Sequence, residues 1–412
     1  MINFDFTLLN PNPTANIFIR IIDEYQAEHL LRTPLRISPA MWDAEKQRPV
    51  NIYKKKFKEL NRKLDRLKIN IAEYLSNRTK KIRLSCYKLQ QIIKENSSNA
   101  KPDYPKDSLL NHIDAYINNR SHLISPSTFK RYMVFLHLLE RFEGHRKRHL
   151  YLHEVNGDFI KEFFEFGNME EYCKSTVHRT IYFVRTILNF LEKRGIRTCV
   201  YELELPKEKR SNLFVTLNED EIIKIKSAEM PENLKAARDW LVISCYTGQR
   251  VSDFMNFNIE NMEIIHGRPC MSFVQQKTQK EILLPLHPAT LNILNQNANT
   301  FPRKLATNIY NSQIKEVVRL AGINNLVKVR KRRGFRVIEM FVQKWEATVS
   351  HIGRRSFASN FYGKIPTALL MEATGHSTEQ MFHRYICTVD TERTRSLGEY
   401  LEEAYRDKFL VA

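Results

Sequence analysis

The sequence contains no pair of cysteines at the short spacing that metal sites and redox motifs use. Its 412 residues include six cysteines, which are scattered over positions 86, 173, 199, 245, 270 and 387. Because a zinc site or a disulfide-rich scaffold needs cysteines at close, regular intervals, the sequence predicts neither. Cysteines spread in this way are typical of a protein in a reducing cytosol.

Long apolar runs and glycine-rich loops are missing as well. No stretch approaches the roughly 18 consecutive apolar residues that a membrane span requires. The N-terminal sequence MINFDFTLLN lacks the basic start and the long apolar run of a signal peptide. We find no glycine-rich phosphate-binding motif, no internal repeat and no low-complexity tract. We therefore expect a cytoplasmic protein that makes no contact with a membrane.

Acidic residues are outnumbered by basic ones. The chain has 65 Lys and Arg against 46 Asp and Glu, which gives a formal charge of +19 and an isoelectric point near 9.6. Hydrophobic residues make up 42% and aromatic residues 11%, so widespread disorder is not expected. The length suits two or three domains. The charge favours a polyanionic partner, although a folded protein can also be basic without one.

The first 96 residues combine a β-rich start with a basic helical segment. The stretches FDFTLL and ANIFIRII, separated by Pro11 and Pro13, predict a small sheet over residues 1–48. Trp42 is expected to anchor its core. From 52 to 96, apolar residues recur at helical spacing among many lysines and arginines. The basic face of such a helix is usually just solvated; here it could also follow phosphates between two domains.

Residues 97–205 are predicted to form a linker followed by helices. Ser125 and Pro126 mark the start of one helix, and Gly195 marks the end of the last. Some basic residues near the helix starts can meet phosphate together with free backbone N–H groups; they are Lys130, Arg131, His178 and Arg179. A helical unit of this kind is most often only a core, so this block alone indicates no function.

Residues 206–412 mix helices with short hairpins. Thr216, followed three residues later by Glu219, predicts the capping box of the first helix. The stretches MSFVQQKTQKEILLPL and VKVRKRRGFRVIEMFV predict two hairpins, and Arg330 lies on the second. Further helical patterns cover 287–297, 306–321 and the chain from 351 onward. The predicted fold class of the whole chain is mainly α with small β elements, an α+β protein.

Four stretches of this last part carry side chains of catalytic types. YTGQRVSDF, VQQKTQKEILLPL, SHIGRRSFASNF and GHSTEQMFHRYI contribute Arg250, Lys277, His351 with Arg354, and His376 with Tyr385. Taken singly, each has an ordinary explanation: an arginine that caps a helix, a solvated lysine in a turn, a histidine near an arginine by chance, or a packed tyrosine. Together they form a set without any metal-ligand pattern.

This set suits phosphoryl transfer to a tyrosine without a metal ion. Arginine forks hold non-bridging phosphate oxygens, and a lysine can protonate a leaving alkoxide. A tyrosine, with an unperturbed pKa of about 10, needs a base or cationic surroundings to attack. Nine residues of continuous helix would put His376 and Tyr385 on opposite faces. The helix is therefore expected to begin after His376, where Ser377 and Gln380 form a capping pattern.

The four stretches resemble the signature boxes of the tyrosine recombinases, the phage integrase family. TGQR resembles the family's TG-x-R box, and Asp253 matches the acidic position that follows it. HIGRRSF resembles the H-x-L-R-R-[ST]-F box. ATGHSTEQMFHRY resembles the L-G-H box, with its tyrosine nine residues after the histidine. The match spans about residues 212–400.

Some positions depart from the family pattern. Apolar residues are usual at the places of Gln249, Gly353 and Ala373-Thr374. None of these changes removes a reacting group, but a glycine weakens a helix by up to about 1 kcal/mol relative to alanine. Spacing alone would also allow Arg355 on the face of His351, and only the resemblance selects Arg354.

The resemblance implies an enzyme that cleaves and rejoins DNA strands. Tyr385 would form a 3′-phosphotyrosyl link, Lys277 would protonate the leaving 5′ oxygen, and His351 would assist proton transfer. The phosphoryl oxygens would be held by Arg250, Arg354 and His376. No cofactor, metal ion or ATP is expected. The implied partners are double-stranded DNA at the bacterial nucleoid, further copies in a homotetramer on that DNA, and DNA-bending accessory proteins.

The resemblance also implies a domain division. Residues 1–96 would form an arm-type DNA-binding domain with a basic linker, 97–205 a helical core-binding domain and 206–412 the catalytic domain. The candidates for DNA contacts are Lys130, Arg131, Arg179 and Arg330. An arm-type start favours the integrase of a mobile element. An invertase or resolvase of the same chemistry, a catalytically inert regulator and a type IB topoisomerase are the alternatives.

Overall fold

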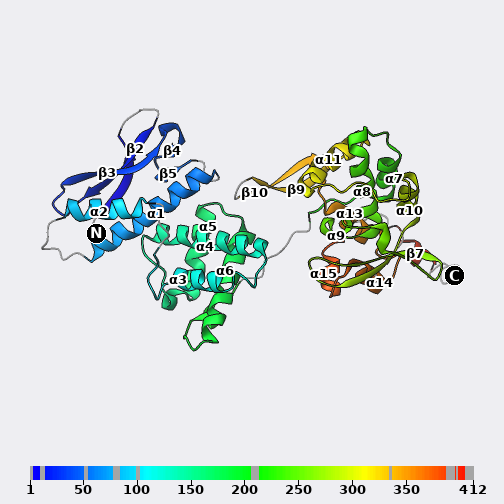
Figure 1. The fold of residues 1–412 in the computed structure, drawn as a ribbon. Coiled ribbons are helices and arrows are strands. Elements are labelled where there is room, and N and C mark those ends of the chain that lie inside the picture. Colours follow the sequence, from blue (N-terminus) through cyan, green and yellow to red (C-terminus); the bar gives the residue numbers. More distant parts are fainter. Residues whose placement is uncertain are drawn as a thin grey trace, which may run out of the picture. The chain divides into compact units, whose positions relative to one another are not determined.

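The computed structural model describes residues 3–9, 14–50, 54–77, 84–98, 103–205, 213–333, 336–386, 395 and 398–403. The main division along the chain, between Glu208 and Lys209, separates two compact units, which are treated one at a time below (Figure 1). The predicted helix in the tail from about residue 390 lies largely outside the described residues. Within the described residues, no helix is both long and apolar enough to cross a lipid bilayer.

The first unit begins with a three-stranded antiparallel sheet in the order β1-β2-β3. Its strands are β1 (Asn3–Leu8), β2 (Ala15–Ile22) and β3 (Glu28–Ile37), and two short strands, β4 (Trp42–Asp43) and β5 (Arg48–Pro49), pair beside it. The alternation of β2 buries every second side chain, as a sheet with one covered face requires. The predicted strands are confirmed, and Trp42 packs half-buried against the edge of this core.

Two helices cover the buried face of this sheet: α1 (Lys55–Ser76) and α2 (Cys86–Asn96). The apolar residues that recur along α1 at helical spacing, Leu60, Leu64, Leu67 and Ile71, are all buried in the shared core. The predicted periodicity is thus confirmed, and its basic residues lie around this apolar stripe.

A helical bundle completes the first unit. Its helices are α3 (Leu109–Asn119), α4 (Pro126–Arg146), α5 (Gly157–Met169) and α6 (Lys174–Glu192). Ser125 caps α4 by accepting a hydrogen bond from the backbone N–H of Thr128, and Pro126 occupies the first turn, as predicted. Gly195 takes a left-handed conformation, with φ 81°, just past the end of α6.

Ion pairs join α1 to α4. Arg141 donates to both carboxylate oxygens of Asp65, at 2.8 and 2.6 Å, and both side chains are largely buried. Arg62 makes a second bidentate pair with Glu140, at 2.8 and 2.9 Å. One face of the basic helix α1 is therefore held against the bundle and is not free to meet solvent or phosphate.

The second unit is organised around the buried helix α8. The helices are α7 (Glu219–Ser227), α8 (Glu232–Thr247), α9 (Val251–Phe254), α10 (Pro288–Gln296), α11 (Thr307–Leu320), α12 (Lys344–Ala347), α13 (Ile352–Phe361), α14 (Thr367–Thr374) and α15 (Glu379–His383). The strands are β6 (Met262–Ile265), β7 (Arg268–Val274), β8 (Glu281–Pro285), β9 (Leu326–Arg333) and β10 (Arg336–Gln343). Both predicted hairpins are present, as β7-β8 and β9-β10.

The cap of α7 differs from the prediction. Asn218, not Thr216, caps the helix, and Glu221, not Glu219, completes the capping box with its backbone. Both residue pairs fit the same pattern. The later start is accompanied by a partly buried ion pair, in which Lys344 donates to both carboxylate oxygens of Glu221 at 2.6 and 2.7 Å. A tertiary contact of this kind is invisible to a local sequence pattern.

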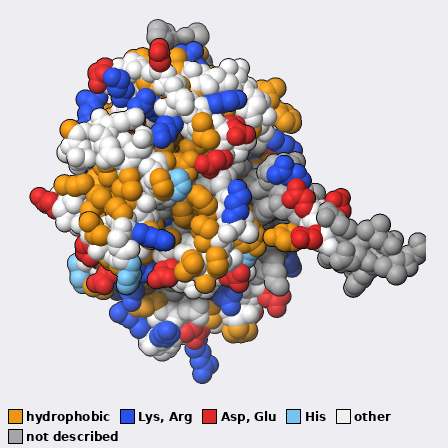
Figure 2. Space-filling view, turned by 90° about the vertical axis from the view of Figure 1, so that its right-hand side faces the viewer, with side chains coloured by type: hydrophobic (Ala, Val, Ile, Leu, Met, Phe, Trp, Pro, Cys, Tyr) orange, Lys and Arg blue, Asp and Glu red, His pale blue; other side chains and the backbone are white. Residues whose placement is uncertain are grey.

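The sheet β6-β7-β8 covers the core with one face only. Met271, Ile282 and Leu284 are buried, whereas Ile264 and Leu283 are exposed. An antiparallel sheet with one solvated face has this alternation. Figure 2 looks onto the side that lies at the right of Figure 1 and shows apolar side chains gathered in the middle of that surface, with charged side chains around them.

Candidate active site

The turn between α8 and α9 places Arg250. Gly248 ends α8 in a left-handed conformation, with φ 67°, and a Cβ at this position would come within 2.5 Å of the Phe357 ring on α13. The glycine of the TGQR stretch therefore both turns the chain and lets α13 approach. Arg250 follows as the N-cap residue of α9.

Arg250 is held by one neutral and one charged neighbour. Its Nη1 donates to Oε1 of Gln275 at 3.0 Å and lies 3.9 Å from the carboxylate of Asp253. Asp253 is buried and accepts a hydrogen bond from the backbone N–H of Gln276 at 3.0 Å. Asp253, which matches the acidic position of the family pattern, thus connects the turn at α9 to the turn between β7 and β8.

Arg354 has no exposed surface. Its Nη1 donates to the Gly248 carbonyl at 2.9 Å, and its Nη2 lies 2.8 Å from the Thr374 carbonyl and 2.9 Å from Nε2 of His376. Within the described residues, its Nε has no hydrogen-bond partner. Burial, followed by the charge of Arg250, lowers the pKa of Arg354 to about 10, which still leaves the guanidinium charged at neutral pH.

Gly353 is explained by the packing of α13 on α8. A Cβ on Gly353 would lie 1.9 Å from Oγ and 2.6 Å from Cβ of Ser244. Real Cβ atoms do not approach other atoms so closely, so any larger residue would push the two helices apart. Gly353, at a position where the family usually has an apolar residue, therefore lies at the close helix contact that brings Arg354 to the end of α8.

The tautomer of His376 follows from its neighbours. Thr374 Oγ1 lies 2.6 Å from the Leu370 carbonyl, to which its single hydroxyl proton is donated, so it accepts from Nδ1 of His376 at 2.8 Å. Nε2 is then the acceptor for Arg354. Burial and then the charges of Arg354, Arg250 and Lys280 lower the pKa of His376 to about 3. The imidazole is therefore neutral at physiological pH.

Tyr385 lies beside this histidine. Gly375 ends α14 with φ 71°, His376 lies in the following turn, and α15 begins only at Glu379, so the prediction that the helix starts after His376 is confirmed. The cap is Thr378 and not Ser377. The ring centres of His376 and Tyr385 are 4.8 Å apart, and Cζ of Arg354 is 5.3 Å from the centre of the Tyr385 ring.

His351 and Lys277 are the exposed members of the predicted catalytic set. His351 is the N-cap residue of α13 and keeps an exposed edge. Burial and then the charge of Arg355 lower its pKa, and the charges of Arg354, Arg250 and Lys277 add to this. His351 is thus a neutral base at physiological pH. Lys277 is exposed in the turn between β7 and β8.

The two arginines that spacing left open occupy different places. Arg354 is buried against Gly248, Thr374 and His376, as described above. The guanidinium of Arg355 lies over the Phe214 ring, with Cζ 4.9 Å from its centre, and burial lowers its pKa.

The DNA-contact candidates lie outside this cluster. Lys130, Arg131 and Arg179 are exposed on α4 and α6 of the first unit, and Arg330 is exposed on β9, where it pairs with Glu339 at 2.9 Å. His178, in contrast, is buried and packs edge-on against the Phe164 ring, so it is not available to a phosphate.

Sequence reasoning missed two residues of the cluster. Gln275 bridges Arg250 to the loop that carries His376, and Thr374 orients the ring of His376. Nothing in the sequence distinguishes Gln275 from the adjacent Gln276. Thr374 could have been noticed in the sequence, because it is polar at a position where the family usually has an apolar residue.

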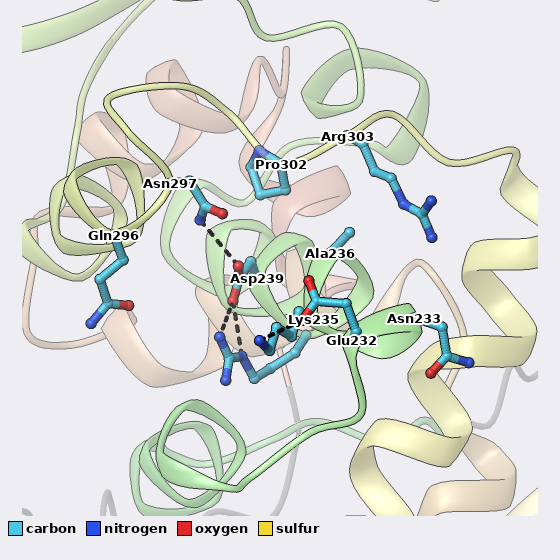
Figure 3. A pocket seen from close by; sticks show the side chains of 10 residues that line it. Glu232, Asn233, Lys235, Ala236, Asp239, Gln296, Asn297, Pro302 and Arg303 are labelled. Carbon is cyan, nitrogen blue, oxygen red and sulfur yellow. Dashed lines mark hydrogen bonds and ion pairs between the residues drawn. The ribbon is translucent and has the colours of Figure 1, made fainter.

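A cavity of about 780 Å³ in the second unit lies apart from these residues. It is lined by side chains near the start of α8 and beyond the end of α10, and none of the six predicted catalytic residues lines it. Figure 3 shows Asp239 in this cavity beside Asn297. The Asp239 carboxylate accepts a hydrogen bond from Nδ2 of Asn297 at 3.2 Å and pairs with Arg238 at 2.9 Å. Within the described residues there is no cluster of His, Cys, Asp and Glu that could hold a metal ion.

Comparison with known proteins defines the class of the fold. Residues 108–197, which hold α3 to α6, match the family model of the phage integrase SAM-like domain. The solved structure of the Tn1549 transposon integrase in complex with a circular intermediate DNA matches 71% of this chain and 99% of its own, with 12% identity and a TM-score of 0.51.

A second solved structure points to the same class. The XerH site-specific recombinase bound to a palindromic difH substrate matches 84% of this chain and 94% of its own, with 16% identity and a TM-score of 0.50. No curated protein matches the chain significantly. The chain has the fold of the tyrosine recombinases, as its sequence predicts, and the predicted α+β class is confirmed.

Proposed function

We propose that the protein is a site-specific tyrosine recombinase of the integrase type, with Tyr385 as its nucleophile. The observation that carries this proposal is the meeting of Tyr385 with Arg354 and His376, beside Arg250, although these residues come from three separate segments. An arginine against the tyrosine ring, with a second arginine linked through Gln275 to the Thr374 carbonyl that the first one contacts, suits the attack of a phenol on a phosphodiester. The two guanidinium groups would offset the charge that grows on the phosphoryl oxygens.

The proposed reaction is a reversible transfer. The phenol oxygen of Tyr385 forms a bond to phosphorus while the bond from phosphorus to the 5′ oxygen breaks, and the phenol proton passes to His351. Lys277 gives a proton to the departing 5′ oxygen, which leaves a 3′-phosphotyrosyl link and a free 5′-hydroxyl. Attack by the 5′-hydroxyl of another strand reverses these steps. Because the bond energy stays in the covalent link, neither a metal ion nor ATP is needed.

The contacts of His376 support a role in holding Arg354. Its Nε2 accepts a hydrogen bond from the guanidinium of Arg354, and its Nδ1–H donates to Oγ1 of Thr374. In this arrangement the neutral ring orients Arg354 toward the tyrosine. A direct contact of His376 with a phosphoryl oxygen requires this hydrogen bond to open.

The partner that the charge favours is double-stranded DNA. The chain carries a charge of +19, and the first unit exposes Lys130, Arg131 and Arg179 on the bundle that matches the SAM-like domain. The solved structures of similar fold hold DNA substrates. Assembly of four copies on two DNA sites, with accessory proteins that bend the DNA, completes the proposal.

The first unit favours an integrase over an invertase or a resolvase. Ahead of the SAM-like bundle it carries the additional sheet β1-β2-β3 with α1 and α2. An extra lobe of this kind suits a protein that bridges two kinds of DNA site. An inert regulator is disfavoured because all six reactive positions are filled.

A nicked suicide substrate tests the proposal. A nick beside the cleavage site releases a short strand after attack, which traps the covalent adduct. The native protein is expected to form an adduct with DNA ends of its element, and Tyr385→Phe is expected to form none while still binding the DNA. Persistence of the adduct in Tyr385→Phe would show that another residue is the nucleophile. Binding without any adduct from the native protein would support an inert regulator instead.

A further inference from the structure

Two glutamines without exposed surface lie between the loops of the candidate active site. Gln249 belongs to the turn between α8 and α9, and Gln275 follows β7 at the start of the turn that carries Lys277. Burying an amide is unfavourable unless its polar groups find partners. The contacts of these two side chains therefore show which loops the buried amides hold together.

Gln275 connects three segments through one amide group. Its Nε2 donates to Oε1 of Gln249 at 3.0 Å and to the Thr374 carbonyl at 3.1 Å. Its Oε1 accepts from Nη1 of Arg250 at 3.0 Å and from Oγ1 of Thr278 at 2.7 Å. The orientation of the amide is thereby determined, because a flipped group would put its nitrogen against the guanidinium and its oxygen against a carbonyl.

Gln249 completes this relay. Its Nε2 donates to the Thr247 carbonyl at 2.9 Å and to the Ala373 carbonyl at 2.7 Å. The backbone leaves room for the amide of Gln275, since a Cβ on Gly375 would lie 2.5 Å from its Oε1. The two amides thus join the turn of Arg250, the turn of Lys277 and the end of α14, just before His376.

We propose that Gln275, supported by Gln249, is a positioning residue that aims the guanidinium of Arg250 at the scissile phosphate. A neutral acceptor orients an arginine without neutralising it, so its full positive charge stays available to the phosphoryl oxygens. The carboxylate of Asp253, at 3.9 Å, is the more distant neighbour. This inference rests on the proposed function, because it assigns Arg250 to the phosphate.

The experiment compares Gln275→Met with the matched control Gln276→Met in the full-length protein. Methionine keeps the length of the side chain but offers no amide, and Gln276 is the exposed neighbour in the same turn. Single-turnover cleavage of the suicide substrate at saturating protein is expected to slow about 10- to 100-fold in Gln275→Met, as for the loss of residues that orient a reacting group. The control should stay within about twofold of the native rate. DNA affinity and Tm are measured for both.

A second substrate separates Arg250 from Lys277. With sulfur in place of the bridging 5′ oxygen, the leaving group is a thiol of pKa about 8.5 and needs no proton from a lysine. Lys277→Ala is expected to recover most of its activity on this substrate. Gln275→Met is expected to remain slow, because the misplaced Arg250 acts on the non-bridging oxygens in both cases.

The outcomes discriminate between the two proposals. Two results would overturn the proposal that Gln275 positions Arg250. One is a native cleavage rate in Gln275→Met, and the other is a recovery of this variant on the sulfur substrate as complete as that of Lys277→Ala. Either result would leave the recombinase proposal intact. A slow rate that is explained wholly by weaker DNA binding or by a lower Tm, with the control unaffected, would also overturn the positioning of Arg250. Absence of an adduct from the native protein would instead overturn the proposed function, and with it this inference.

Discussion

The ring of Tyr385 lies over the guanidinium of Arg354, with 5.3 Å between Cζ and the ring centre. Arg354 has no exposed surface, whereas Tyr385 is half-buried and so lies on the outer side of the pair. A phosphate oxygen can reach Arg354 only after the groups that cover it move. The proposed nucleophile is thus one of the groups that close the proposed phosphate site.

Removal of this cover is expected to strengthen the binding of a small phosphate. Tyr385→Ala opens a path to Arg354, whereas Tyr385→Phe keeps an aromatic ring over the guanidinium. Titration with inorganic phosphate by calorimetry should therefore give a Kd several-fold lower for Tyr385→Ala than for Tyr385→Phe. Equal affinities would show that Tyr385 does not control access to Arg354.

Gly353 is expected to tolerate no side chain. Because a Cβ would lie 1.9 Å from Oγ of Ser244, Gly353→Ala should separate α13 from α8 and lower the free energy of unfolding by about 1–3 kcal/mol. Urea unfolding measures this change. Ser244→Gly in the same chain should restore part of the loss. Gly157→Ala is the matched control, because a Cβ there would meet only the Glu202 carbonyl at an ordinary 3.7 Å.

The neutral state of His376 predicts a pH dependence of stability. Its pKa falls from 6.5 to about 3 on folding, so between these values only the unfolded chain takes up a proton. The free energy of unfolding should therefore decrease as the pH falls through this window. His376→Gln lacks this contribution while the other titrating groups remain. Urea unfolding at about pH 7 and about pH 5 should show a smaller difference for the variant than for the native protein. An equal or larger difference would mean that His376 is protonated in the folded chain.

The contact between α1 and α4 should depend on a complete ion pair. Burial raises the pKa of Asp65, and Arg141 opposes this shift. Arg141→Met leaves the carboxylate buried without this partner, which is expected to cost about 3–5 kcal/mol of unfolding free energy. Asp65→Asn combined with Arg141→Met should recover part of this loss. Lys161→Ala, which breaks an exposed pair with Asp158, should change the stability little and serves as the control.

The sequence predicts the reacting groups better than the contacts that hold them. Box spacing names Arg250, Arg354, His376 and Tyr385. The structure brings them close together, with Arg354 on α13 and the other three in turns at helix ends. The spacing also predicts the turn after His376, since a continuous helix would separate it from Tyr385. These inferences need only helix geometry and the order of the boxes.

The remaining features depend on contacts between distant segments. The relay of Gln275 joins residues almost 100 positions apart in the chain, at Thr374. The role of Gly353 depends on Ser244, which lies on another helix. The predicted caps of α7 and α15 are also wrong: Asn218 rather than Thr216 caps α7, and Thr378 rather than Ser377 caps α15. Several residues of capping type lie close together at each start, and the local pattern alone does not choose among them.

The most direct test of the central claim is to identify the residue that carries the DNA. The trapped adduct is digested with a protease and a nuclease, and the peptide that retains a nucleotide is sequenced by mass spectrometry. The account predicts a 3′-linked nucleotide on Tyr385 in the native protein and no modified peptide from Tyr385→Phe. A nucleotide on Tyr362, the other tyrosine of the same small core, or on any other residue would contradict it.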